Sequence, residues 1–304
     1  MGNIQLTYRC LLSAFLLSVA SIAFGQAPLT DRAVALYQEG DLMAARDAAL
    51  EAVQSPEERE TAYAWFVKGF VFKEIYKQIE KANPYSENRE VAVESIKMSM
   101  QLDSIGEYTD NNQKALTFIA TTYYNDAVKL TKSLSFDNLE EPEKFYAKYK
   151  TIDALVEPNK SYAKQDVEMF MNLAKGNRLL YEKDMEKNTA YFDNVVDYYK
   201  KALELNPEEY SANHNLAINL YNRGVYKIRK INHNTEIFEL MAIQEECVTY
   251  FKKSLPYMLK ANELNKNREE TVKGLMAIYR SLSDDEQAMI YETQLDIILN
   301  EGGK

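Results

Sequence analysis

The chain has few of the residues on which most catalytic and metal sites depend. Its 304 residues include two cysteines and two histidines, His214 and His233, which lie on different segments. A zinc site would need more Cys or His ligands beside them. The sequence also has no Gly-x-Ser-x-Gly turn and no glycine-rich phosphate loop. We therefore predict that it is not an enzyme and has no catalytic residues, no metal and no cofactor; a hydrolase that uses His214 is the alternative.

Glycine and proline are scarce, with ten and seven residues, and there are no extended runs of β-branched residues. Ala, Leu, Glu, Lys and Tyr are abundant instead, a composition that favours helices. No segment rich in Gly, Pro or Ser is long enough to divide domains. An all-α protein with one continuous domain is the simplest prediction.

The first 25 residues have the composition of a secretory signal peptide. Arg9 is followed by the apolar run LLSAFLLSVASIAF, and the small residues Ala23 and Gly25 precede a cleavage site at Gln26. The run is too short for a comfortable membrane span. Cys10 precedes it and is wrongly placed for lipid attachment. We expect an exported protein, periplasmic or secreted, with no membrane insertion after cleavage.

Removing residues 1–25 would change two properties of the chain. Only Cys247 would remain, so an internal disulfide is excluded and stability must come from packing. The formal net charge would move from −10 to −11, because Arg9 is the only charged residue in that segment. This acidity argues against nucleic acid as a partner, since binding to phosphates depends on Lys and Arg.

Residues 189–224 contain two helical patterns separated by a proline. Val195, Tyr199 and Ala202 are spaced to share one face of a helix, and Asn206-Pro207 stops it. A second apolar pattern follows, and Gly224 is placed to end the second helix. A helix pair this short cannot bury its apolar faces alone. It must therefore stack on similar neighbouring pairs.

The same pattern recurs along the chain. Ser254, Met258 and Ala261 each lie 59 residues after Val195, Tyr199 and Ala202. Further matching positions are Tyr37, Gly40, Ala45, Ala49, Ala52, Trp65, Gly69, Phe72, Ala92, Ile96, Ser99, Tyr123, Phe145, Tyr149, Ile152, Gly176, Leu179, Leu275, Met276 and Tyr279.

These positions resemble the 34-residue unit of the tetratricopeptide repeat family. The resemblance implies a right-handed α-solenoid of about six helix pairs with insertions between the paired helices. The domain would cover residues 26–304, with units at about 29–57, 60–104, 112–158, 165–207, 210–265 and 268–300.

The longest insertion, residues 225–246, lies in the fifth unit and is too apolar for a solvated linker. It contains Tyr226, Ile228, Ile231, His233, Ile237 and Phe238. We interpret these residues as capping a neighbouring helix; contact with a partner is the alternative. Pro256 lies within a later helical pattern, so the helix from about Thr235 is predicted to kink or break near Ser254.

The resemblance also implies which residues line the concave surface. They are Tyr63, Phe66, Phe70, Asn177, Tyr181, His214, Ile218, Tyr221 and Asn222. Aromatic side chains and Asn amides suit an extended peptide, although Phe66 and Phe70 could instead pack against the adjacent unit. Some family members clamp a C-terminal carboxylate with a Lys, but Phe66, Leu173 and His214 occupy that position here.

The leading hypothesis is a non-enzymatic scaffold or adaptor that binds a protein or peptide in the cell envelope. The cut before Gln26 resembles that of exported proteins of the Bacteroidetes type. The alternative is a glycan-binding accessory component of an outer-membrane nutrient-uptake system, in which some of the 22 tyrosines would stack on sugars. The sequence does not identify the partner, the pathway or the oligomeric state.

Overall fold

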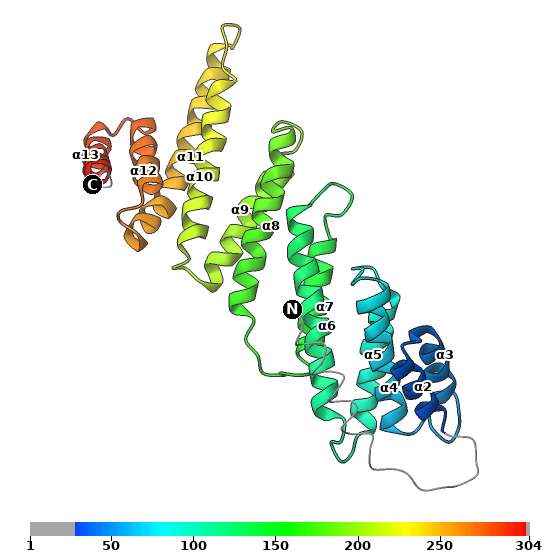
Figure 1. Ribbon diagram of the computed structural model, residues 1–304. Coiled ribbons are helices and arrows are strands. Elements are labelled where there is room, and N and C mark those ends of the chain that lie inside the picture. Colours follow the sequence, from blue (N-terminus) through cyan, green and yellow to red (C-terminus); the bar gives the residue numbers. More distant parts are fainter. Residues whose placement is uncertain (1–27, 302–304) are drawn as a thin grey trace. The chain divides into compact units, whose positions relative to one another are not determined.

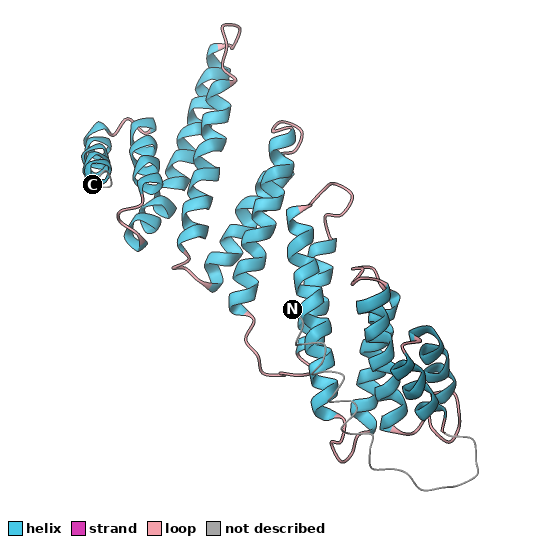
Figure 2. Cartoon of the chain, viewed as in Figure 1, coloured by secondary structure: helices cyan, strands magenta, loops and turns pink. Residues whose placement is uncertain are grey.

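The computed structural model describes residues 28–301, and this part of the chain is helical, without strands (Figures 1 and 2). The expected signal peptide lies outside the described residues. The helices are α2 (Leu29–Glu39), α3 (Leu42–Ala52), α4 (Ala62–Glu74), the π-helical turn η1 (Ile75–Ile79), α5 (Glu87–Leu102), α6 (Thr109–Lys132), α7 (Glu141–Asp153), α8 (Ala163–Lys183), α9 (Thr189–Leu205), α10 (Tyr210–Arg229), α11 (Ile237–Leu264), α12 (Glu269–Ser281) and α13 (Asp285–Glu301). They pack in consecutive pairs, which confirms the all-α fold of stacked helix pairs.

The chain forms two compact units that divide after Ala115. In the first, alanines of α2 and α3 pack against Val67, Val71 and Ile75. Such small side chains let helices approach closely, so this core uses close backbone contact more than large side chains. The turn before α3 has Gly40 at a φ of 90°, a conformation that glycine adopts without strain, and the Asp41 carboxylate accepts a hydrogen bond from Ala44 N.

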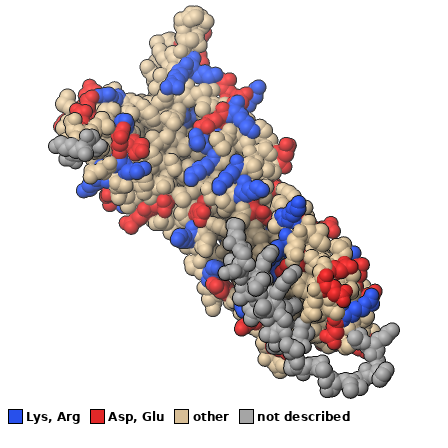
Figure 3. Space-filling view, in the orientation of Figure 1, with Lys and Arg blue, Asp and Glu red and all other residues tan. Residues whose placement is uncertain are grey.

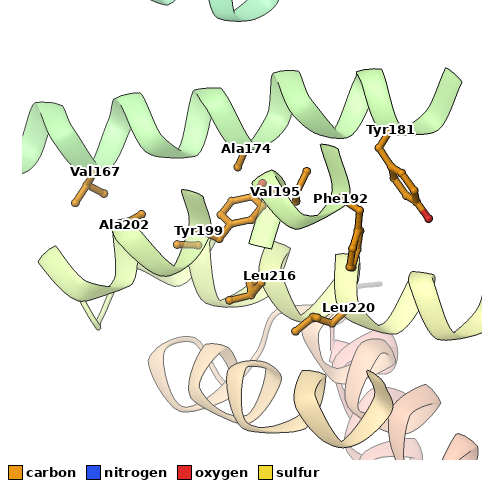
Figure 4. Packing of buried hydrophobic residues seen from close by; sticks show 10 residues of the cluster. Val167, Ala174, Tyr181, Phe192, Val195, Tyr199, Ala202, Leu216 and Leu220 are labelled. Atoms are coloured by element: carbon orange, nitrogen blue, oxygen red, sulfur yellow. The ribbon is translucent and has the colours of Figure 1, made fainter. Parts of the chain in front are cut away.

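The second unit runs from Leu116 onward, and its largest described core lies between α8, α9 and α10. Val195, Tyr199 and Ala202 from α9 are buried between the other two helices (Figure 4). Ser254, Met258 and Ala261 of α11 are fully buried as well. The 59-residue spacing seen in the sequence thus marks equivalent positions in two successive second helices.

The expected role of Gly224 was wrong, because α10 continues past it to Arg229. Gly224 is buried inside the helix, and a Cβ at that position would lie 2.6 Å from Cε1 of Phe251. The Cys247 thiol also donates to the Gly224 carbonyl at 3.3 Å. The glycine therefore permits close contact between α10 and α11, a tertiary requirement that cannot be distinguished in sequence from a helix end.

Of the kink or break predicted near Ser254, the break does not occur, because α11 is one helix of 28 residues with Pro256 inside it. A proline removes one helical hydrogen bond, the one that would reach the Lys252 carbonyl. Both Lys252 and Pro256 are exposed, so water can solvate that carbonyl. The buried residues Phe251 and Met258 on the other face hold the helix across this point.

The insertion in the fifth unit lengthens α10 and α11 into a projecting hairpin, drawn in yellow in Figure 1. Three apolar residues near its tip do not cap a neighbouring helix, whereas Tyr226 and Ile231 are half-buried. Phe238 is 81 % exposed, and Ile237 and Met241 are 63 % and 58 % exposed. The capping interpretation is therefore wrong for these residues.

Among the described helices, none combines the length and the hydropathy that a membrane span requires.

Close helix packing at Gly176 makes its replacement costly. A Cβ at Gly176 would lie 2.7 Å from the Thr131 carbonyl oxygen of α6, which is backbone and cannot rotate away. We expect Gly176→Ala to lower the free energy of unfolding by about 1–3 kcal/mol, despite the better helix propensity of alanine. Chemical denaturation measures this change.

Gly274→Ala is the matched control, since its Cβ would meet the flexible end of Met258 at 2.6 Å. That side chain can move, so the expected change stays within about 1 kcal/mol. Equal losses for the two variants would contradict the distinction between backbone and side-chain contacts.

The exposed hairpin residues should contribute little to stability. We expect Phe238→Ser to change the free energy of unfolding by no more than about 0.5 kcal/mol. Phe251, which is 2 % exposed in the same helix, is the comparison, and Phe251→Ala should cost about 3–5 kcal/mol. A large loss for Phe238→Ser in thermal or chemical denaturation would restore the capping interpretation.

Candidate binding groove between α8 and α10

An open groove lies between α8 and α10, with Tyr199 of α9 at its floor. It encloses about 600 Å³, within the range of small-molecule and peptide side-chain sites. All three helices belong to the second unit. The apolar cluster of Figure 4 forms the wall behind it, and the Tyr181 hydroxyl points away from that cluster.

Four cations and one carboxylate line the groove, in a chain whose net charge is −10. Lys175 and Arg178 lie on α8, and Arg223 and Arg229 lie on α10. The carboxylate is Glu182, which pairs with Arg178 at 2.6 Å one helical turn away. On the face drawn in Figure 3, Lys and Arg side chains gather over α8–α10. The groove is thus locally positive on an acidic protein.

Three asparagines of α10 supply neutral hydrogen-bonding groups. Asn215, Asn219 and Asn222 are spaced at four and three residues, so they share one side of the helix. The Asn219 amide donates to the Asn215 carbonyl at 2.7 Å, and Asn222 is exposed. An amide side chain both donates and accepts, as a peptide backbone does.

Arg223 is the deepest cation, with 8 % of its surface exposed. Its Nη1 donates to the Tyr181 hydroxyl at 2.6 Å and to the Met185 carbonyl at 3.1 Å. Its guanidinium also lies 5.3–5.7 Å from the ring centroids of Tyr181, Phe192 and Tyr226. Aromatic faces and neutral oxygens therefore surround this charge.

Two tyrosines that line the groove, Tyr181 and Tyr199, have raised pKa values. Burial raises the pKa of Tyr199 to about 12, and the nearby Arg178 charge offsets part of this effect. Burial also raises the pKa of Tyr181, and the hydrogen bond from Arg223 offsets it in part. Both hydroxyls therefore stay protonated at neutral pH.

The groove brings together only part of the predicted partner-binding set. Ile218, Asn222 and Tyr181 line it, but Tyr181 is 5 % exposed and already bonded to Arg223. Asn177 is buried, donates to the Leu173 carbonyl and accepts from the Asn194 amide. Of these four residues, Ile218 and Asn222 keep surface available to a partner.

Tyr63, Phe66 and Phe70 belong to the first unit and are half-buried. Tyr63 and Phe66 stack on Tyr108, with ring centroids 5.8 Å and 5.0 Å away, and Phe70 meets the edge of Tyr37 at 5.2 Å. These aromatic rings thus pack against neighbouring rings, as the alternative interpretation of Phe66 and Phe70 expects. A role in partner binding stays a prediction for their remaining surface.

His214 and Tyr221 face α12 instead of the groove. His214 Nδ1 lies 3.1 Å from the buried Thr271 hydroxyl, and the Tyr221 hydroxyl lies 3.4 Å from Ser281 Oγ. The His214 ring stacks on Tyr210 at 5.7 Å. Burial lowers the pKa of His214, and the Arg268 charge acts in the same direction while Glu270 opposes it.

The four cations of the groove were not identified from sequence. Lys175 and Arg178 are three residues apart in α8, and Arg223 and Arg229 are six apart in α10. Neither spacing is distinctive, and the 46 acidic residues of the whole chain conceal the pattern. Among the described residues, no cluster of three or more His, Cys, Asp or Glu side chains could hold a metal ion.

The lowered pKa of His214 predicts a pH dependence of stability. In the unfolded chain, histidine titrates near 6.5, whereas the folded protein favours the neutral form. The contribution of His214 to stability is therefore fully present above about pH 6.5. It decreases below this pH, because the unfolded chain then binds a proton more readily than the folded protein does. Below this pH, the free energy of unfolding should decrease more for the wild type than for His214→Gln. If the difference in unfolding free energy between the two proteins stays constant with pH, His214 does not have a lowered pKa.

No known family model matches the chain, and no curated protein matches it. Similar solved structures include the C-terminal part of a TPR repeat-containing protein from Cytophaga hutchinsonii, with 12 % identity over 96 % of this chain and 88 % of that chain and a TM-score of 0.32. The type IV pilus biogenesis factor PilW is 17 % identical over 90 % and 94 % of the two chains, with a TM-score of 0.33. MamA is 13 % identical over 76 % and 94 %, with a TM-score of 0.32. Tetratricopeptide repeat proteins are therefore among the structural neighbours of this chain.

Proposed function

We propose that this protein is a non-enzymatic binding scaffold that holds an extended segment of another protein in the groove between α8 and α10. The observation that carries the proposal is the groove itself, about 600 Å³ of open space lined by cations, amides and a few apolar side chains. Sites of this size usually combine an apolar lining with a few polar groups that fix orientation.

An extended peptide fits the polar groups of the groove. Asn219 and Asn222 can exchange hydrogen bonds with a peptide backbone, and Ile218 and Val225 provide apolar contact for its side chains. His214 faces α12 and therefore lies outside the groove, and the raised pKa values of Tyr181 and Tyr199 keep their hydroxyls protonated. Binding without chemistry is the function that this arrangement supports best.

We further propose that the protein is exported and acts in the periplasm or outside the cell. The support is the sequence of residues 1–25, where Arg9 precedes an apolar run that ends in small residues. N-terminal sequencing of the protein from the native host should begin at Gln26, and an intact Met1 would reject the proposal.

Glycan binding is the second candidate, and one site favours it. A smaller hollow of about 310 Å³ lies between α6, α7 and α8, lined by Tyr124, Tyr149, Gln165 and Glu168. Aromatic faces beside amides and carboxylates suit sugars. However, the Tyr124 hydroxyl already donates to Glu168 at 2.7 Å. A glycan array that detects no binding would remove this candidate.

The groove proposal predicts that blocking the groove abolishes peptide binding. Residues 26–304 would be incubated with a printed array of random-sequence peptides, and hits would be measured by fluorescence anisotropy. Asn222→Trp places a bulky ring on the exposed rim of the groove and should weaken every hit by at least about tenfold.

Gln244→Trp is the control, because Gln244 is an exposed, neutral residue of α11 outside the groove. It should leave binding unchanged. An array without hits, or equal losses for the two variants, would reject the groove as the peptide site.

A further inference from the structure

We infer that the groove recognises carboxylate side chains, so that its occupant is an acidic segment of a partner protein. This inference rests on the proposed function and adds the chemistry of the occupant. It is carried by the buried Arg223 and by the excess of cations in the groove, whose described lining holds four cations and only one carboxylate, Glu182.

Arg223 lacks the partner that a buried guanidinium usually has. Among the described residues it forms no ion pair, and its Nε is buried without a hydrogen-bond acceptor. A buried cation without a carboxylate is costly unless something else offsets its charge. The rings of Tyr181, Phe192 and Tyr226 offset part of it, but none of them carries a negative charge.

The rim of the groove also has cations without carboxylate partners. Lys175 and Arg229 are exposed and form no ion pair with any described residue, whereas Arg178 pairs with Glu182. By contrast, Lys227 near the end of α10 pairs with Glu246, and Lys230 just after the helix pairs with Glu186. Nearby lysines are thus neutralised within the protein, while three of the four groove cations, Lys175, Arg223 and Arg229, have no carboxylate partner among the described residues.

The distribution of charge favours an acidic peptide over a nucleic acid. The net charge of −10 repels a long polyanion at a distance, and the groove supplies only four cations. Carboxylates spaced along a peptide can reach Lys175, Arg223 and Arg229 separately. The Asn side chains between them would bind the peptide backbone, a group that nucleic acids lack.

The charge at these positions can be removed without touching the buried core. Lys175→Gln/Arg229→Gln changes two rim residues and leaves Arg223 and its hydrogen bonds in place. Lys252→Gln/Lys253→Gln is the matched control, because it changes net charge equally at two exposed residues of α11 outside the groove. Circular dichroism would verify that both variants stay helical.

The probes are peptides of alternating Glu and Ala and of alternating Gln and Ala, both acetylated and amidated so that neither has terminal charges. The wild type should bind the Glu peptide at least about tenfold more tightly than the Gln peptide, with weaker binding at high salt. The groove variant should lose most of this preference, and the control variant should keep it.

Three results would overturn the inference: equal binding of the two peptides, equal losses in the two variants, or tighter groove-dependent binding of poly(U) RNA than of the Glu peptide. The proposed function is judged separately by the random-peptide array. Hits that Asn222→Trp abolishes, without a preference for Glu, would retain the peptide groove and reject its acidic occupant. An array without hits would reject both.

Discussion

Burial of the apolar faces of short helix pairs is the constraint on which the structure depends. An isolated pair such as α8 and α9 leaves one apolar side in water, so each pair must pack against the next. In the second unit, Val195, Tyr199 and Ala202 are buried because α10 covers the side of α9 that α8 leaves free. Small residues at the tightest contacts, Gly176 and Gly224 among them, set how closely successive helices approach.

The same requirement explains where function could develop. Positions that face a neighbouring helix are fixed by packing, as Asn177 and Tyr181 show with their internal hydrogen bonds. Side chains that are not fixed by packing occur where helices extend beyond the shared repeat. The extension of α10 to Arg229 supplies one end of the groove, and the α10–α11 hairpin carries the exposed Ile237, Phe238 and Met241.

Arg223 connects packing with recognition. It lies one residue before Gly224, whose lack of a side chain lets Phe251 approach α10, and it is enclosed by aromatic rings. Those rings stabilise the cation without neutralising it. The groove therefore keeps a positive potential although the protein as a whole is acidic, and this contrast underlies the proposed preference for carboxylates.

The amino-acid sequence by itself determined the helical class, the pairing of helices and most of the buried positions. Those features follow from spacing along one chain, as with Ser254, Met258 and Ala261 at the same intervals as Val195, Tyr199 and Ala202. The tertiary structure alone decided the continuity of α11 through Pro256, the exposure of the hairpin and the grouping of Lys175 with Arg223 and Arg229. These depend on which side of a helix meets water and which residues of different helices meet each other, and spacing within one helix contains neither.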